Sequence, residues 1–171
     1  MGNKNFLLGL LVILLVLGMA IVGCNNGTTD GESDTWSNVT SLSQLEGTWK
    51  APSSANYSID GIKVTVKYTN YTVTFDPLNK TMSASGSFIS TYSGGKINEY
   101  WPYYKGNAEY MNSMEGVTVT INDANHSITQ TSNNFSVELS DAEINMFQIN
   151  QDETKLKIAA GEGIQVIYTN Q

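Results

Sequence analysis

Regular alternation of apolar and polar residues is the feature that most constrains how this chain folds. From residue 62 to residue 68 every second side chain is apolar or aromatic, and Lys or Thr fills the positions between them. The alternation resumes in the opposite phase over residues 71–75. Because successive side chains of a strand point to opposite faces, both stretches predict strands with one buried face. The change of phase predicts a bulge or a sharp bend near Thr69 and Asn70.

The same alternation predicts further strands along the chain. They lie at residues 45–51, 81–92, 117–121, around 128, 135–139, 147–149, 156–158 and 164–168. Segments rich in Asn, Asp and Pro separate them and predict turns, at residues 76–79, 122–125 and 151–154. About nine short strands joined by tight turns indicate an all-β, mainly antiparallel domain, built as a sandwich or a barrel.

Two segments depart from this alternation. In the first, Ile97–Met114, the apolar residues recur at helical spacing. Asn98 is a suitable N-cap for a helix there, and Pro102 is compatible with it only near the first turn. We therefore expect a short helical insertion at about residues 98–114. In the second, residues 140–143 match a capping box, which predicts one short helical turn.

The N-terminal segment is of a different kind. Lys4 precedes an almost unbroken apolar run over residues 6–22, about 17 residues long, at the short end of the ~20 that cross a bilayer. The run ends in Ile-Val-Gly-Cys, and this resembles the signal of bacterial lipoproteins. The resemblance implies that residues 1–23 are removed and that Cys24 carries the lipid as the first mature residue. An uncleaved membrane anchor is the alternative; a conventional secretory signal lacks its small-residue cleavage site here.

A polar segment separates this signal from the strands. Residues 25–34 contain no apolar side chain able to join a core, so residues 24–35 are predicted to be a flexible tether. The domain proper then covers residues 36–171. We expect it to be held by its lipid at the outer membrane or cell surface of a bacterial envelope, with inner-membrane anchoring as the open alternative.

A second resemblance lies at the start of the domain. Gly47 and Trp49, separated by one residue, are similar to the Gly-x-Trp signature that opens the first strand of lipocalins. Together with the lipoprotein signal, this resembles bacterial lipocalin-like lipoproteins, in particular those of the spirochaete surface. The family implies a barrel of about eight or nine strands whose closed end is plugged by Trp49. The chain has no Arg to stack on that Trp, so Lys155 or Lys157 is expected to give a weaker cation–π contact. Alternatively, Trp49 is a core residue of another sandwich.

Composition and the titratable residues argue against several functions. Nine basic residues, all Lys, stand against 16 acidic ones, which is unsuitable for nucleic-acid binding. The single Cys24 forms no intrachain disulfide and no structural zinc site. His126 is the single His, lies beside a predicted turn and has no partner nucleophile. We therefore expect no enzymatic activity, no catalytic residue, no metal and no cofactor.

Aromatic residues with polar tips gather in and near the predicted helix. They are Tyr92, Tyr100, Trp101, Tyr103, Tyr104 and Tyr110. The candidate ligand-binding residues among them are Tyr92, Tyr100, Trp101 and Tyr104, because such rings line ligand mouths. The alternative is that Tyr100, Trp101 and Tyr104 are the buried stripe of the helix.

Two functions follow from these patterns. The first is binding of a small apolar or amphipathic ligand inside the barrel. The second is a surface interaction protein or adhesin, which contacts a host or surface protein through loops and exposed aromatics while side chains fill the barrel.

Overall fold

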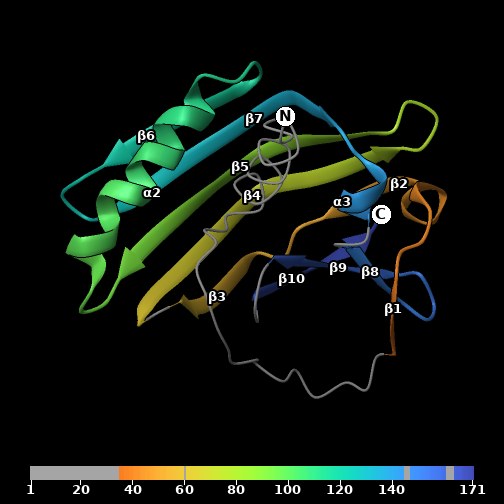
Figure 1. Ribbon diagram of the computed structural model, residues 1–171, viewed down its shortest axis with the longest axis horizontal. Coiled ribbons are helices and arrows are strands. Elements are labelled where there is room, and N and C mark those ends of the chain that lie inside the picture. The colour runs from red at the N-terminus through yellow and green to blue at the C-terminus, as the bar shows by residue number, and fades with distance from the viewer. Residues whose placement is uncertain (1–34, 60, 145–146, 161–163) are drawn as a thin grey trace, which may run out of the picture.

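The computed structural model describes residues 35–59, 61–144, 147–160 and 164–171 (Figure 1). The predicted signal peptide, the lipid-attachment residue Cys24 and nearly all of the predicted tether lie outside the described residues. Within the described part, no helix combines the length and apolar character needed to cross a membrane.

Strands dominate the described chain. They are β1 (Trp36–Asn38), β2 (Gly47–Lys50), β3 (Ser54–Ile59), β4 (Ile62–Asp76), β5 (Thr81–Ser93), β6 (Val117–Asn122), β7 (Ser127–Glu138), β8 (Phe147–Asn150), β9 (Lys155–Ala160) and β10 (Ile164–Asn170). The helical elements are the 3-10 turn η1 (Leu42–Leu45), α2 (Ile97–Asn112) and α3 (Asp141–Ile144). All the named strands pair antiparallel, which confirms the predicted all-β class with one helical insertion.

The strands form one curved sheet in the order β1-β8-β9-β10-β2-β4-β5-β7-β6, with β3 beside the other end of β4. Figure 1 shows β4, β5 and β7 running side by side, with β8, β9 and β10 turned beneath them. The sheet ends at β1 and at β6, and no pairing between described residues joins these two strands. Closure into a barrel, which the lipocalin resemblance implies, is therefore not confirmed.

A line of backbone irregularities crosses the three long strands. In β4 the register with β5 shifts between Thr69 and Thr72, and Asn70 has φ 49°. The register of β5 with β7 shifts at the same level, where Gly86 has φ 105° and Asn134 has φ 54°. A Cβ on Gly86 would stand 2.3 Å from the backbone oxygen of Asn70, so only Gly fits there. The bulge predicted from the change of phase is confirmed, and it belongs to a bend shared by neighbouring strands.

This bend line divides the domain into two halves. The half that we call proximal comprises β1, β2, β8, β9, β10, η1 and the adjoining ends of β4, β5 and β7. The distal half comprises β3, β6, α2 and the other ends of the same three strands.

The proximal half holds an apolar core around Trp49. This side chain is fully buried, and its Nε1 donates to the carbonyl oxygen of Leu45 at 2.9 Å. The rings of Phe75 and Phe147, both buried, meet edge to face with centroids 5.2 Å apart. Gly47 has φ 116°, a conformation that side chains rarely adopt, so it permits the bend into β2. The expected cation–π partner was Trp49, but the Lys157 ammonium lies over the ring of Trp36, 3.9 Å from its centroid.

In the distal half α2 packs on β6 with one apolar face (Figure 1). Its buried residues are Ile97, Trp101, Tyr104, Ala108 and Met111. Two residues of the predicted stripe, Trp101 and Tyr104, are thus buried, and the third, Tyr100, is half-buried. The predicted N-cap is wrong: Lys96 occupies that position without a side-chain hydrogen bond, because the helix already begins at Ile97.

The short helix α3 begins with the predicted capping interaction. Glu143 Oε2 accepts hydrogen bonds from the backbone N–H and from the hydroxyl of Ser140, both at 2.6 Å. The Glu143 side chain is almost fully buried in making them. These bonds satisfy donors that the start of a helix otherwise leaves free.

Candidate functional site

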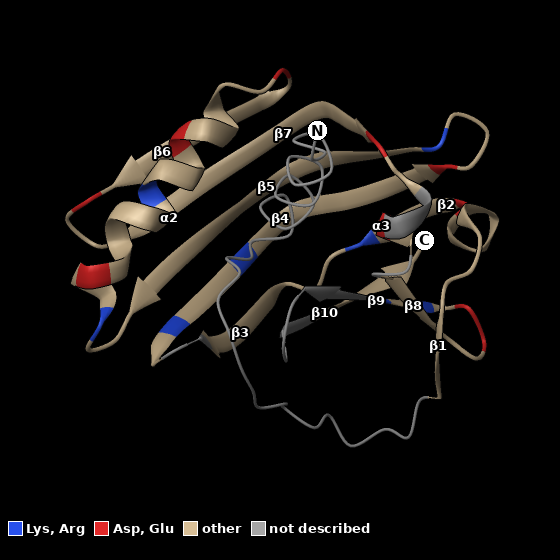
Figure 2. Cartoon of the chain, in the orientation of Figure 1, with Lys and Arg blue, Asp and Glu red and all other residues tan. Residues whose placement is uncertain are grey.

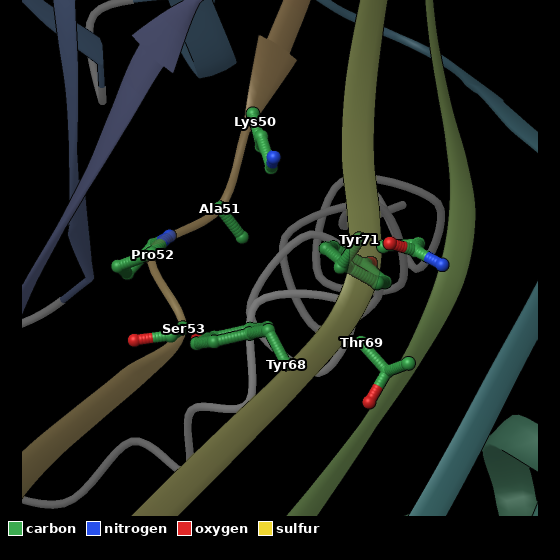
Figure 3. A pocket seen from close by; sticks show the side chains of 8 residues that line it. Lys50, Ala51, Pro52, Ser53, Tyr68, Thr69 and Tyr71 are labelled. Carbon is green, nitrogen blue, oxygen red and sulfur yellow. The ribbon is translucent and has the colours of Figure 1, made fainter.

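An open hollow of about 290 Å³ lies at the fork where β2 and β3 separate along β4 (Figure 3). Residues 50–53, which connect β2 to β3, line one side of it, and residues 68–71 of β4 line the other. Both β2 and β3 pair with β4, but with different halves of it. The hollow therefore sits on the bend line, between the proximal and distal halves.

The backbone explains why the strands part here. Ala51 N–H donates to the Tyr71 carbonyl at 2.9 Å, and Tyr68 N–H donates to the Ser53 carbonyl at 3.0 Å. Between these two bonds Pro52 has no N–H to offer to β4. Opposite Pro52 stands the bulge of β4, so the hydrogen-bond ladder is interrupted on both sides. The result is a window in the sheet framed by two backbone hydrogen bonds.

Tyrosine rings form the inner wall of this hollow. The rings of Tyr68 and Tyr71 lie 5.8 Å apart, and both pack against Phe88, at 5.9 and 5.5 Å. Burial raises the pKa of the Tyr68 and Tyr71 hydroxyls well above the ordinary tyrosine value, and a hydrogen bond between Tyr71 and Ser132 opposes this shift only in part. Both hydroxyls therefore remain uncharged at physiological pH, and the wall is aromatic and neutral.

The rim of the hollow is polar and exposed. It is made by Lys50, Ser53, Thr69 and Asn70. Figure 2 shows that charged residues concentrate in the turns and on α2, while the long strands are mostly uncharged. Lys50 is the one charged residue lining the hollow, and it has no ion-pair partner among the described residues. The hollow thus joins an aromatic interior to a cationic edge.

The candidate ligand residues from the sequence lie elsewhere, beneath α2. The ring centroids of Tyr92 and Tyr104 are 4.4 Å apart, and those of Tyr92 and Trp101 are 5.9 Å apart. Their side chains are buried, so the structure brings these three together as packed core, with Tyr100 half-buried beside them. None of the four lines the hollow at the fork. Contact between these residues and a ligand stays a prediction.

A polar clasp fastens α2 to the turn between β6 and β7. Trp101 Nε1 donates to Asp123 Oδ1 at 2.8 Å, and Lys105 Nζ lies 3.0 Å from Asp123 Oδ2. The hydrogen bond from Trp101, followed by the one from Lys105, lowers the pKa of the Asp123 carboxyl. His126, half-buried, meets the Trp101 ring edge-on at 5.0 Å. These contacts give His126 and Asp123 a structural role that the sequence did not reveal.

Within the described ranges no group of three or more His, Cys, Asp or Glu side chains is arranged to hold a metal ion. The residues of the hollow were also missed from the sequence, although two signals pointed to its place. The change of phase at Asn70 marked the bulge, and Pro52 marked the end of a strand. What neither signal showed is that the two face each other.

Comparisons with known proteins found no match: no family model, no curated protein and no solved structure is similar to this chain. The functional argument therefore depends on the chemistry of the hollow and on the sequence patterns at the N-terminus.

Proposed function

We propose that this chain is a lipid-anchored lipoprotein of the bacterial envelope, and that its β domain binds a small amphipathic ligand in the hollow at the β2–β3 fork. The observation that carries the proposal is the combination of two tyrosine rings, Tyr68 and Tyr71, with the cationic rim residue Lys50 around one opening. A volume of about 290 Å³ lies near the lower end of the ~300–1,000 Å³ typical of ligand pockets, which favours a small ligand.

The two sides of the hollow favour different parts of such a ligand. The neutral ring of Tyr68, backed by the more deeply buried ring of Tyr71, offers apolar contact surface, and burial of each methylene group against it contributes about 0.8 kcal/mol. Lys50 lies at the solvent edge, where an anionic group can pair with it while staying hydrated. Because an exposed ion pair contributes only about 0.2–1 kcal/mol, we assign affinity to the rings and orientation to Lys50.

We further propose that the domain is lipocalin-like, and the start of the domain supports this. Gly47 and Trp49 stand at the base of the proximal core, in the strand that the resemblance identifies. The proposed ligand site differs from the family expectation, because it is a window between β2 and β3 and not the interior of a closed barrel.

The lipid anchor is supported by the Ile-Val-Gly-Cys sequence that ends the N-terminal apolar run. Two or more acyl chains hold a protein to a membrane far better than one, which gives only reversible binding. Growth with a radiolabelled fatty acid tests this directly. The wild-type chain should be labelled and Cys24→Ala should not, and an unlabelled wild type would refute the anchor.

Ligand binding can be tested with decanoate and decanol, which share a chain and differ in charge. The full-length lipoprotein, extracted in a nonionic detergent, is examined by native mass spectrometry for adducts. We expect both ligands to bind the wild type. Lys50→Gln should lower the affinity for decanoate roughly threefold and leave the affinity for decanol unchanged.

Two further variants complete the design. Lys63→Gln, on the exposed face of β4 away from the hollow, is the matched charge control and should leave the affinity for both ligands unchanged. Ala51→Leu places a larger side chain in the hollow and should weaken the binding of both decanoate and decanol. Absence of any decanoate or decanol adduct on the wild type would overturn the proposal.

The alternative, a surface interaction protein, depends on exposed apolar side chains. In the described part of the chain, the large apolar side chains that are exposed belong to Leu78, Tyr103 and Ile89. Their exposed fractions are 95%, 42% and 37%. Leu78 lies in the β4–β5 turn and Tyr103 on α2, at opposite ends of β5, so they do not form one patch. The ligand-binding proposal is therefore preferred. Loss of host-protein binding in Tyr103→Ala or Leu78→Ser would favour the alternative.

A further inference from the structure

One buried polar atom near the hollow has no partner. The Tyr168 side chain is fully buried, and its hydroxyl makes no hydrogen bond with any described residue. Buried hydroxyls are nearly always hydrogen-bonded, because leaving one without a partner sacrifices the bond that it makes with water in the unfolded chain. An unpaired donor in a folded domain therefore calls for an explanation.

The position of Tyr168 connects it to the hollow. Its neighbour Thr169 pairs with Lys50 of β2, which places Tyr168 beside Ala51, the residue after β2. Lys50 and Ala51 both line the hollow. The pKa of Tyr168 is raised first by burial and then by the proximity of Tyr68 and Tyr71, the two rings of the inner wall. The Tyr168 side chain is thus close to both rings of the inner wall, although it does not itself line the hollow.

The neighbouring tyrosines do not share this condition. Tyr71 is hydrogen-bonded to Ser132, and Gln130 Nε2 lies 3.4 Å from the same Ser132 hydroxyl. Tyr68 likewise has interactions of its own. Of these three, Tyr168 is the one whose buried hydroxyl is left without a hydrogen-bond partner among the described residues. A molecule at the rim reaches this hydroxyl only when the Tyr68 ring turns aside about its side-chain bonds.

We infer that the Tyr168 hydroxyl recognises the inserted end of the ligand, and that this end carries an oxygen acceptor such as a keto, ether or hydroxyl group. This inference rests on the proposed function and narrows its ligand class. The ligand is then an oxygenated amphiphile with an anionic group at Lys50, an apolar middle against Tyr68 and Tyr71, and an acceptor at Tyr168. A plain fatty acid would leave the Tyr168 donor unpaired in a complex from which water is excluded.

The test compares decanoate with a series of oxo-decanoates whose keto group is placed at successive carbons. Each is titrated by native mass spectrometry against the full-length wild type and against Tyr168→Phe, which keeps the ring and removes the hydroxyl. We expect at least one keto position to bind the wild type five- to tenfold more tightly than decanoate, and Tyr168→Phe to abolish this preference. Because both proteins meet the same free ligand, partition into detergent cancels in the comparison.

The possible failures are distinguishable. If decanoate and every oxo-decanoate fail to bind the wild type, the proposed function itself fails. If decanoate binds but no keto position improves on it, or if the preference survives in Tyr168→Phe, the ligand class inferred from Tyr168 is overturned while the hollow remains a binding site. A melting temperature of ligand-free Tyr168→Phe at or above that of the wild type confirms that the variant folds.

Discussion

The two halves of this domain are built on the same three strands but differ in what those strands bury. On the proximal side of the bend the inward positions of these strands hold Phe75, Met82 and Phe135, all at most 2% exposed. On the distal side they include Ser90 and Gln130, also almost fully buried. The alternation of inward and outward residues changes phase at the bend and then resumes on its far side. The difference is therefore one of side-chain chemistry on a common backbone.

This contrast indicates a division of roles. The apolar inward positions of the shared strands stabilise the proximal half, since burial of large side chains is the dominant favourable contribution to folding. The interior of the distal half also contains polar groups that need hydrogen-bond partners, such as Tyr71, Ser132 and Gln130 at the boundary. The hollow lies where the two kinds of interior meet. A ligand there contacts aromatic rings on one side and hydrogen-bonding groups on the other.

The largest effect should come from the two buried tryptophans, one in each half. Trp49→Ala removes a side chain with no solvent exposure and should lower the free energy of unfolding by about 4 kcal/mol. Trp101→Ala should cost about 3 kcal/mol, at the lower end for a buried Trp, because Trp101 retains 8% exposure and its partner Asp123 is open to water. Urea unfolding measures both. Equal losses would remove the distinction between the halves.

The bend line itself is tested by glycine. Gly86→Ala forces a Cβ against the backbone of Asn70 at φ 105° and should cost about 3 kcal/mol. The matched control is Gly106→Ala within α2, where an added Cβ meets nothing within 4 Å. That change should stabilise the domain by about 0.5–1 kcal/mol. Thermal melts that show a small effect for Gly86→Ala would mean that the bend is not essential to the fold.

The elements that the sequence predicted well are those whose signal is local. The bulge at Asn70 was recognisable because apolar residues mark the buried face on both sides of it. The insertion at α2 and the capping box of Ser140 and Glu143 likewise depend on residues within one or two helical turns. Strand β3 was missed, because its inward residues Ala55 and Tyr57 are too few to set a period against the polar residues around them.

Features that require two distant segments to meet were beyond the sequence. Pairing of β2 with β10, and the open ends at β1 and β6, are decided by which edges find each other and not by alternation. The hollow needs Pro52 opposite the β4 bulge, and the clasp needs Trp101 near Asp123, 22 residues later. Tyr68 and Tyr71 read in the sequence as ordinary core residues. Only the structure shows that they border an opening.

A smaller effect should separate two tyrosines at the boundary. Tyr168→Phe removes a buried hydroxyl without a partner and should raise the free energy of unfolding by about 1 kcal/mol in the absence of ligand. Tyr71→Phe breaks the hydrogen bond to Ser132 and should lower it by about 1 kcal/mol. Urea unfolding of the two variants gives the comparison. Effects of the same sign would argue that both hydroxyls are equally satisfied.

The smallest effect is a difference in how two indole groups respond to acid. Trp101 donates to a carboxylate, whereas Trp49 donates to a backbone carbonyl, which does not titrate. The hydrogen bond from Trp101 lowers the pKa of Asp123 in the folded chain. Since its folded pKa is depressed, Asp123 contributes stability above its unfolded pKa and loses it as the pH falls through the folded value.

Nuclear magnetic resonance can follow both indole N–H signals in a pH titration. We expect the Trp101 signal to move as Asp123 is protonated below pH ~4, with the Trp49 signal unchanged until the domain unfolds. Asp123→Asn keeps an oxygen acceptor but cannot ionise, so it should hold the Trp101 signal constant over the same range. A Trp49 signal that moves together with that of Trp101 would show that acid loosens both halves at once. Independent movement of Trp101 would instead show that α2 responds to its own clasp while the proximal core stays intact.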